Sequence, residues 1–171
     1  EFDGSAWARI ARSHLGGLPP EVDLKAEVAL GNVVRALSAA DGPDGRPLVR
    51  AAHDLSNGGL VQSLVDSALR FGIGGVFDVA GAARRDCVGD HEMLLSESQA
   101  RAFVAVPEAA VKAVFAAAEA EGVDAVRIGT TGGDMLAISG VDLLAAEGEG
   151  CGWIASIDEL RELNDTGRLY F

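Results

Sequence analysis

The chain is poor in basic and aromatic residues. It carries 14 lysines and arginines against 26 aspartates and glutamates, and aromatic residues make up 5% of its 171 positions. Nucleic-acid-binding surfaces need clustered basic side chains, so we expect no nucleic-acid partner. The net charge of -12 does not exclude an anionic ligand. A phosphate site needs only local N–H groups and one or two arginines.

Cysteine and long apolar runs are also scarce. The two cysteines, Cys87 and Cys151, show neither a Cys-x-x-Cys spacing nor a nearby pair of histidines, which predicts a reducing, cytoplasmic setting without a disulfide framework or a zinc site. No apolar run approaches the roughly 20 residues of a membrane span, and residues 1–5 do not resemble a secretion signal. We therefore expect a soluble protein with no membrane partner.

The length fits one compact domain that needs no covalent cross-links. The sequence contains no internal repeat and no low-complexity segment beyond an alanine bias. The breaker-rich residues 16–20 separate a short first segment from the rest. We expect an N-terminal arm and linker over residues 1–22 and a single α/β domain over residues 23–171.

Hydrophobic periodicity predicts alternating helices and strands. Helices are expected over residues 5–13, 24–37, 60–71 and 107–120, and from a cap at Ser156 to residue 163. Strands are expected over residues 48–52, 73–79, 102–106, 125–129 and 135–139, with a polar loop at 81–90 and a hairpin turn at 130–134. This alternation predicts a three-layer α/β/α (α+β) arrangement, and the hairpin makes the sheet mixed.

A polar segment with two glycines, residues 53–60, joins the strand predicted at 48–52 to the next helix. The first N–H groups of a helix lack intrahelical partners and carry partial positive charge, which favours a phosphate or carboxylate. Gly58 and Gly59 would let a ligand approach the backbone closely, and Ser56 or Asn57 is expected to cap the helix. The segment equally suits an ordinary strand-to-helix turn, so both interpretations stay open.

A second polar cluster occupies residues 94–101, between two hydrophobic runs. Its hydrogen-bonding side chains need partners if they are even partly buried. Glu97 and Arg101 are four residues apart, but such a pair on an exposed helical turn contributes only about 0.2–0.5 kcal/mol. The cluster is therefore either part of a binding site or a structural network that caps or pairs with the first segment.

Together these segments resemble the C-terminal domain of the aminoimidazole ribonucleotide synthetase superfamily. The resemblance is carried by residues 53–60 and 95–101 and by Ile128 and Gly129 before a turn and strand. Within the superfamily, residues 4–8, 20–24 and 156–160 are most similar to the last domain of the phosphoribosylformylglycinamidine synthases, the second of two copies. The resemblance spans nearly the whole chain.

The resemblance implies a domain of an ATP- and magnesium-dependent ligase of purine biosynthesis. Such enzymes convert formylglycinamide ribonucleotide to formylglycinamidine ribonucleotide with ammonia from glutamine. It also implies a preceding nucleotide-binding domain, a glutaminase subunit and a small adaptor subunit as partners. We expect the catalytic histidine and the magnesium ligands to lie outside these residues, and the isolated chain to be inactive and to bind no cofactor tightly.

The resemblance also suggests which residues contact substrate or phosphate. The family's Glu-Ser-Gln motif maps onto Glu97, Ser98 and Gln99, and similarity to the second copy implies an auxiliary cleft. His53 is either a phosphate partner or a histidine that orients Asp54. The complete set is His53, Asp54, Ser56, Gly58, Gly59, Glu97, Ser98, Gln99 and Arg101.

Two alternatives remain. The domain could be a structural and interaction lobe without a ligand role. It could also be the same lobe of another superfamily member, namely an aminoimidazole ribonucleotide synthetase, a selenophosphate synthetase, a thiamine-phosphate kinase or a hydrogenase-maturation protein. Apolar surface covered by other domains in the longer enzyme would also make a homodimer of the isolated chain a reasonable hypothesis.

Overall fold

The computed structural model describes residues 3–86, 89–140 and 152–167. Its contacts divide the chain into two compact units. Unit 1 comprises residues 1–20, 56–97 and 126–171, and unit 2 comprises residues 21–55 and 98–125. The sequence boundary proposed at residue 22 stays a prediction. Cys87 and Cys151 lie outside the described residues.

Unit 1 is built on a mixed four-stranded sheet in the order β4-β2-β5-β6. Its strands are β2 (Gly75–Asp78), β4 (Gly129–Thr131), β5 (Met135–Ser139) and β6 (Gly152–Ser156). Its helices are α1 (Ala6–Arg12), α3 (Gly59–Phe71), α4 (Ala80–Asp86), α5 (Asp90–Leu95) and α7 (Ile157–Asp165). Only the β2–β5 pair is parallel among the described strands.

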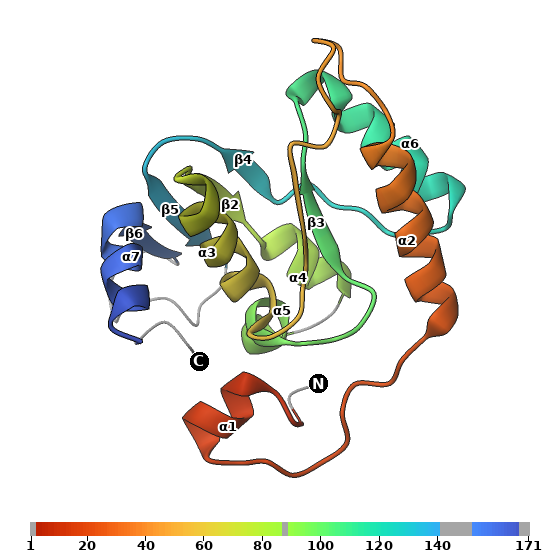
Figure 1. The fold of residues 1–171 in the computed structure, drawn as a ribbon. Coiled ribbons are helices and arrows are strands. Elements are labelled where there is room, and N and C mark those ends of the chain that lie inside the picture. The colour runs from red at the N-terminus through yellow and green to blue at the C-terminus, as the bar shows by residue number, and fades with distance from the viewer. Residues whose placement is uncertain (1–2, 87–88, 141–151, 168–171) are drawn as a thin grey trace. The chain divides into compact units, whose positions relative to one another are not determined.

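Strand alternation gives this sheet one buried face. Phe77, Leu136 and Ile138 are nearly inaccessible, whereas Val76 and Ile154, which point the other way, are each 63% exposed. Helices α3 and α7 lie side by side (Figure 1) and contribute the buried Leu60, Leu64 and Leu160 to the core of this unit.

Side chains and glycines fix the helix ends in unit 1. The Ser156 hydroxyl accepts a hydrogen bond from Glu159 N, and the Glu159 carboxylate accepts one from Ser156 N, which completes a capping box. The backbone N–H and hydroxyl of Ser156 lower the pKa of Glu159. Gly72 ends α3 at a φ of +64°, which suits glycine.

Unit 2 pairs two helices with a two-stranded antiparallel ribbon. Helix α2 (Leu24–Ser38) runs beside α6 (Val111–Ala120), which follows the short 3₁₀ turn η1 (Glu108–Ala110) (Figure 1). The ribbon consists of β1 (Ala51–Asp54) and β3 (Ala102–Ala105). The small core of this unit is formed by Val33, Leu37, Leu48 and Ala110.

The mixed α and β fold with a mixed sheet is confirmed, but several local predictions were wrong. The strand expected at 48–52 is β1, which begins at Ala51, and the polar loop expected at 81–90 is largely helix α4 and the start of α5. The strand expected at 125–129 overlaps β4 only at Gly129. Among the described residues, no helix is long and apolar enough to cross a membrane.

The predicted hairpin over residues 130–134 was also wrong. Strands β4 and β5 do not pair with each other, because β2 lies between them, antiparallel to β4 and parallel to β5. The Gly132-Gly133 turn is instead bonded to the residue before β2, since Gly74 N donates to Gly133 O and Gly132 N donates to Gly74 O. The mixed character of the sheet was therefore predicted correctly but for the wrong reason.

We predict that Leu136→Ala lowers the free energy of unfolding by about 2–5 kcal/mol, because Leu136 is 1% exposed and truncation leaves a cavity. Met135→Ala is the matched control on the same strand, since Met135 is 38% exposed and surface changes cost about 0.5 kcal/mol or less. Urea denaturation measures both. Equal losses for the two variants would contradict the assignment of the buried face.

Candidate functional site

Both polar segments singled out in the sequence contain a point where the chain passes between the two units. The passages fall between Leu55 and Ser56 and between Glu97 and Ser98. Unit 1 therefore holds Ser56, Gly58, Gly59 and Glu97 of the predicted set. Unit 2 holds His53, Asp54, Ser98, Gln99 and Arg101.

In unit 1, the start of α3 is bound by a carboxylate of the chain itself. Glu97 Oε1 accepts a hydrogen bond of 2.9 Å from Gly58 N and another of 3.0 Å from Ala6 N, the first residue of α1. The N-terminus of a helix stabilises a negative group, because its first N–H groups lack intrahelical partners and the helix dipole places partial positive charge there. The position near Gly58 at which the sequence predicted a bound anion is therefore occupied by the carboxylate of Glu97, a side chain of the protein itself.

Ser56 and Asn57 do not cap α3, contrary to expectation. The cap residue is Gly58, which has a φ of +75° and forms no side-chain capping bond. Ser56 contributes only its backbone, since its carbonyl accepts a hydrogen bond of 3.0 Å from Gly59 N. Gly58 has no side chain that could cap the helix, and its positive φ suits glycine. The carboxylate of Glu97 takes the capping role instead.

Gly59 is needed for close packing between backbones. A Cβ at this position would lie 2.8 Å from Leu94 O, from the Leu95 carbonyl carbon and from Ser96 O. The φ of Gly59 is +64°, so a side chain would also be strained. Helix α3 therefore approaches the end of α5 as closely as its backbone allows, and Ser63 reinforces this start by donating its hydroxyl to Gly59 O.

We predict that Gly59→Ala destabilises the protein by about 1–3 kcal/mol more than Gly72→Ala, because it adds a backbone clash to the same conformational strain. Gly72 has an identical φ of +64°, and a Cβ there would meet nothing within 4 Å. Urea unfolding measures the stability of both variants, and the difference between them isolates the backbone clash at Gly59 from the strain of a positive φ that both positions share. Equal losses of stability would show that the close packing at Gly59 does not contribute to stability.

In unit 2, His53 and Asp54 end strand β1. The Nδ1 atom of His53 lies 2.6 Å from Asp54 O, and its ring stacks on Phe103, its cross-strand partner, with centroids 5.9 Å apart. Because a carbonyl oxygen only accepts, this contact is a hydrogen bond when Nδ1 carries a proton. His53 Nδ1 also lies 3.6 Å from the exposed Asp54 carboxylate.

The residues 98–101 form a non-helical loop that precedes β3. Gln99 is exposed, whereas Ser98 and Arg101 are half-buried. Leu55 N donates a 2.9 Å hydrogen bond to Arg101 O, and Ala100 N donates one of 2.9 Å to Glu27 Oε1. The helical turn considered for Glu97 and Arg101 is therefore absent, since α5 ends at Leu95.

Glu27 was missed by the sequence analysis. It lies in the first turn of α2, 73 residues before its partner Ala100. An acidic residue in the first turn of a helix is common because of the helix dipole, so nothing in the sequence distinguished Glu27. Only the fold of unit 2 brings it to the loop.

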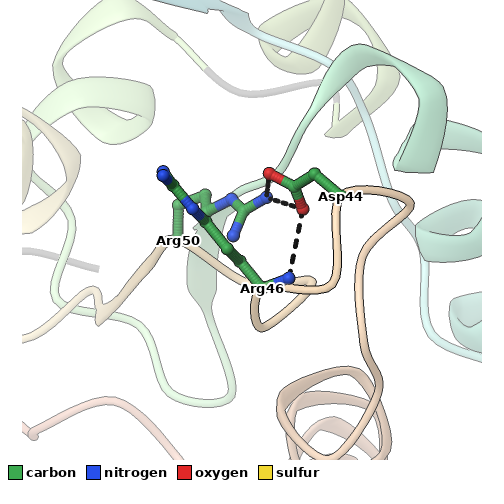
Figure 2. Close-up of polar contacts among 3 residues, drawn as sticks. All are labelled: Asp44, Arg46 and Arg50. Atoms are coloured by element: carbon green, nitrogen blue, oxygen red, sulfur yellow. Dashed lines mark hydrogen bonds and ion pairs between the residues drawn. The ribbon is translucent and has the colours of Figure 1, made fainter.

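A second polar cluster of unit 2 stabilises the turn before β1. Figure 2 shows the Asp44 carboxylate between Arg50 and the backbone of Arg46. Arg50 Nη2 lies 2.6 and 2.7 Å from the two carboxylate oxygens, and Arg46 N donates at 3.3 Å. The hydrogen bond from Arg50 is the main reason that the pKa of Asp44 is lowered from its ordinary value of 3.8.

We predict that Arg50→Gln raises the pKa of Asp44 toward 3.8, measured by carboxyl NMR titration. Because the pKa is lowered in the folded state, the pair stabilises the fold above the unfolded-state pKa, and this contribution disappears as the pH falls through the folded-state pKa. Arg46→Gln is the control, since Arg46 bonds through its backbone. An equal rise in both variants would contradict the assigned cause.

The described residues include no group of three or more histidine, cysteine, aspartate or glutamate side chains arranged to hold a metal ion. In unit 2, the loop 98–101 carries hydroxyl, amide and guanidinium groups. Groups of these kinds form hydrogen bonds with polar and phosphorylated ligands.

A family model described as "AIR synthase related protein, C-terminal domain" matches residues 1–139. Among curated relatives, the chain is 43% identical over 140 residues to the phosphoribosylformylglycinamidine synthase subunit PurL of a Nocardioides species, which covers 82% of this chain and 17% of that protein. It is 41% identical over 165 residues to PurL of Renibacterium salmoninarum, covering 96% of this chain and 19% of that protein. The chain thus spans less than a fifth of the length of these relatives.

Solved structures show the same fold. The structure of PurLQS from Thermotoga maritima matches with a TM-score of 0.65 and 16% identity, covering 92% of this chain and 24% of that chain. The structure of T. maritima PurL complexed with ATP matches with a TM-score of 0.52 and 16% identity, covering 66% of this chain and 19% of that chain.

Proposed function

The chain belongs to the family of AIR synthase related C-terminal domains, and we propose that it is one lobe of a phosphoribosylformylglycinamidine synthase. The main support for this proposal is the 41% identity to a PurL subunit over 96% of the chain. The proposed enzyme is a cytoplasmic carbon–nitrogen ligase of purine biosynthesis. It converts formylglycinamide ribonucleotide, glutamine and ATP to formylglycinamidine ribonucleotide.

In this proposal the chain orients the ribonucleotide through the loop 98–101. The Arg101 guanidinium and the Ser98 hydroxyl suit phosphate and ribose oxygens, and the Gln99 amide both donates and accepts hydrogen bonds. His53 and Asp54 belong to the same unit and end the strand that pairs with β3. Glu97, Ser56, Gly58 and Gly59 have a supporting role, because the Glu97 carboxylate is engaged with two backbone N–H groups.

We assign ATP and Mg²⁺ to other parts of the enzyme. The described residues contain no set of carboxylates and histidines suited to a metal ion. In the full enzyme, the metal and ATP would activate the substrate amide for attack by ammonia. The proposed partners of this lobe are the remaining synthase domains, a glutaminase subunit and a small adaptor subunit. The name PurLQS of the Thermotoga structure supports an assembly of PurL with further subunits.

A structural and interaction lobe is the second candidate. The bonds of Glu97 and the packing of Gly59 favour it, because these features stabilise unit 1 without needing a ligand. This candidate predicts that changes in loop 98–101 alter assembly with the other subunits rather than turnover.

The two candidates are separated by Gln99→Ala in the full-length synthase that carries this chain. We predict at least a tenfold higher KM for formylglycinamide ribonucleotide, an unchanged KM for ATP and normal assembly, measured by steady-state kinetics and gel filtration. Glu119→Ala is the control, since Glu119 is exposed on α6. Normal kinetics together with lost assembly would favour the structural lobe and refute the binding role.

A further inference from the structure

Ala100 adopts an unusual backbone conformation within the loop 98–101. Only two non-glycine residues among those described have positive φ, Ser13 at 51° and Ala100 at 54°. Ser13 is the C-cap of α1, where this conformation is common. Ala100 caps no helix, and its Cβ makes the left-handed region unfavourable. Something in the surrounding structure must therefore hold it there.

Glu27 is the side chain that meets this requirement. Its half-buried carboxylate accepts a 2.9 Å hydrogen bond from Ala100 N. The start of α2, on which Glu27 lies, is itself fixed, because the Asp23 side chain accepts hydrogen bonds from Lys25 N and Ala26 N. A hydrogen bond to a charged acceptor is stronger than one between neutral groups, so Glu27 offsets the strain at Ala100.

The loop is also fixed on its other side. Leu55 N donates to Arg101 O, and this bond continues the β1–β3 ribbon, in which Asp54 lies opposite Ala102. Ala100 and Arg101 are thus held from two different elements, α2 and the end of β1. Gln99, which precedes them, is exposed.

We propose that Glu27 is a positioning residue for ligand binding by the loop 98–101. By holding Ala100 in the left-handed conformation, its carboxylate sets the direction of the backbone between Gln99 and Arg101, the two residues that flank Ala100. Glu27 acts through the Ala100 N–H and does not touch the ligand. The conformational part of this proposal stands on the geometry of unit 2, and the binding part rests on the proposed function.

The conformational part is tested by amide NMR on the 171-residue chain. Glu27→Ala should move the Ala100 amide proton upfield and raise its hydrogen exchange rate at least tenfold, whereas Glu27→Gln, which keeps an acceptor oxygen, should change both much less. Glu119→Ala, an exposed glutamate of the same unit, is the control and should change neither. An unaltered Ala100 amide in Glu27→Ala would overturn the proposal.

The binding part is tested by kinetics of the full-length synthase. Glu27→Ala should raise the KM for formylglycinamide ribonucleotide about tenfold with kcat within about twofold of the unaltered enzyme, equivalent to losing about 1.4 kcal/mol of binding. Ala100→Gly should rescue it, because glycine adopts the left-handed conformation without support. The double variant should return to within threefold of the original KM, which a general loss of stability would not explain.

The outcomes separate this proposal from the proposed function. If Gln99→Ala raises the KM and Glu27→Ala does not, the positioning role is refuted and the binding loop stands. If the Ala100 amide responds as expected but neither variant changes the KM, the binding role of the loop is refuted and the conformational role of Glu27 stands. If Glu27→Ala fails to fold, the double variant Glu27→Ala/Ala100→Gly still tests the proposal. It should fold and keep a KM within threefold of the original, and failure to fold or a raised KM in the double variant would overturn the positioning role.

Discussion

Unit 1 depends on one carboxylate that serves two helix starts. Glu97 accepts hydrogen bonds from the N–H groups of Gly58, before α3, and of Ala6, in α1, and these two donors lie 39 and 91 residues away in the sequence. Neither of these N–H groups has an intrahelical partner, so the Glu97 carboxylate supplies the acceptor that each of them needs. A single side chain thereby ties the first residues of the chain to the middle of it, and the glycines around it allow the approach.

Gly58, Gly59 and Glu97 therefore act together at the start of α3. Gly58 turns the chain, Gly59 lets α3 reach the backbone of residues 94–96, and that approach brings Glu97 to the helix start. A negative group at a helix N-terminus is favourable wherever it comes from. This explains why a segment that has the composition of an anion site can be satisfied by the protein itself.

The sequence predicted the longer helices well because their periodicity and caps are local. The helices expected over residues 24–37 and 60–71 and from the cap at Ser156 are present as α2, α3 and α7. The predictions from the sequence failed where strands that pair with each other are far apart along the chain. Nothing near Gly132 and Gly133 indicates that β2, more than 50 residues earlier, separates β4 from β5. Helices α4 and α5 were missed because their polar composition resembles that of a loop.

The same limit applies to the candidate site. Its residue types were recognisable because hydroxyl, amide and guanidinium groups stand together in the sequence at 98–101. The residue that supports this loop was not recognisable, since Glu27 reaches Ala100 only through the packing of α2 in unit 2. Likewise, the acceptor role of Glu97 depends on Ala6 and Gly58, which no local pattern connects to it.

The division of the chain has a consequence for how the protein folds. The polypeptide alternates between the units four times, and neither unit is a continuous segment. The parallel pair β2–β5 joins residues about 60 positions apart, as in Phe77 and Ile138. Each unit must therefore close long loops before its core is complete, which raises the contact order and slows folding relative to helical proteins of this size. Neither unit could be obtained as an uninterrupted piece of the gene.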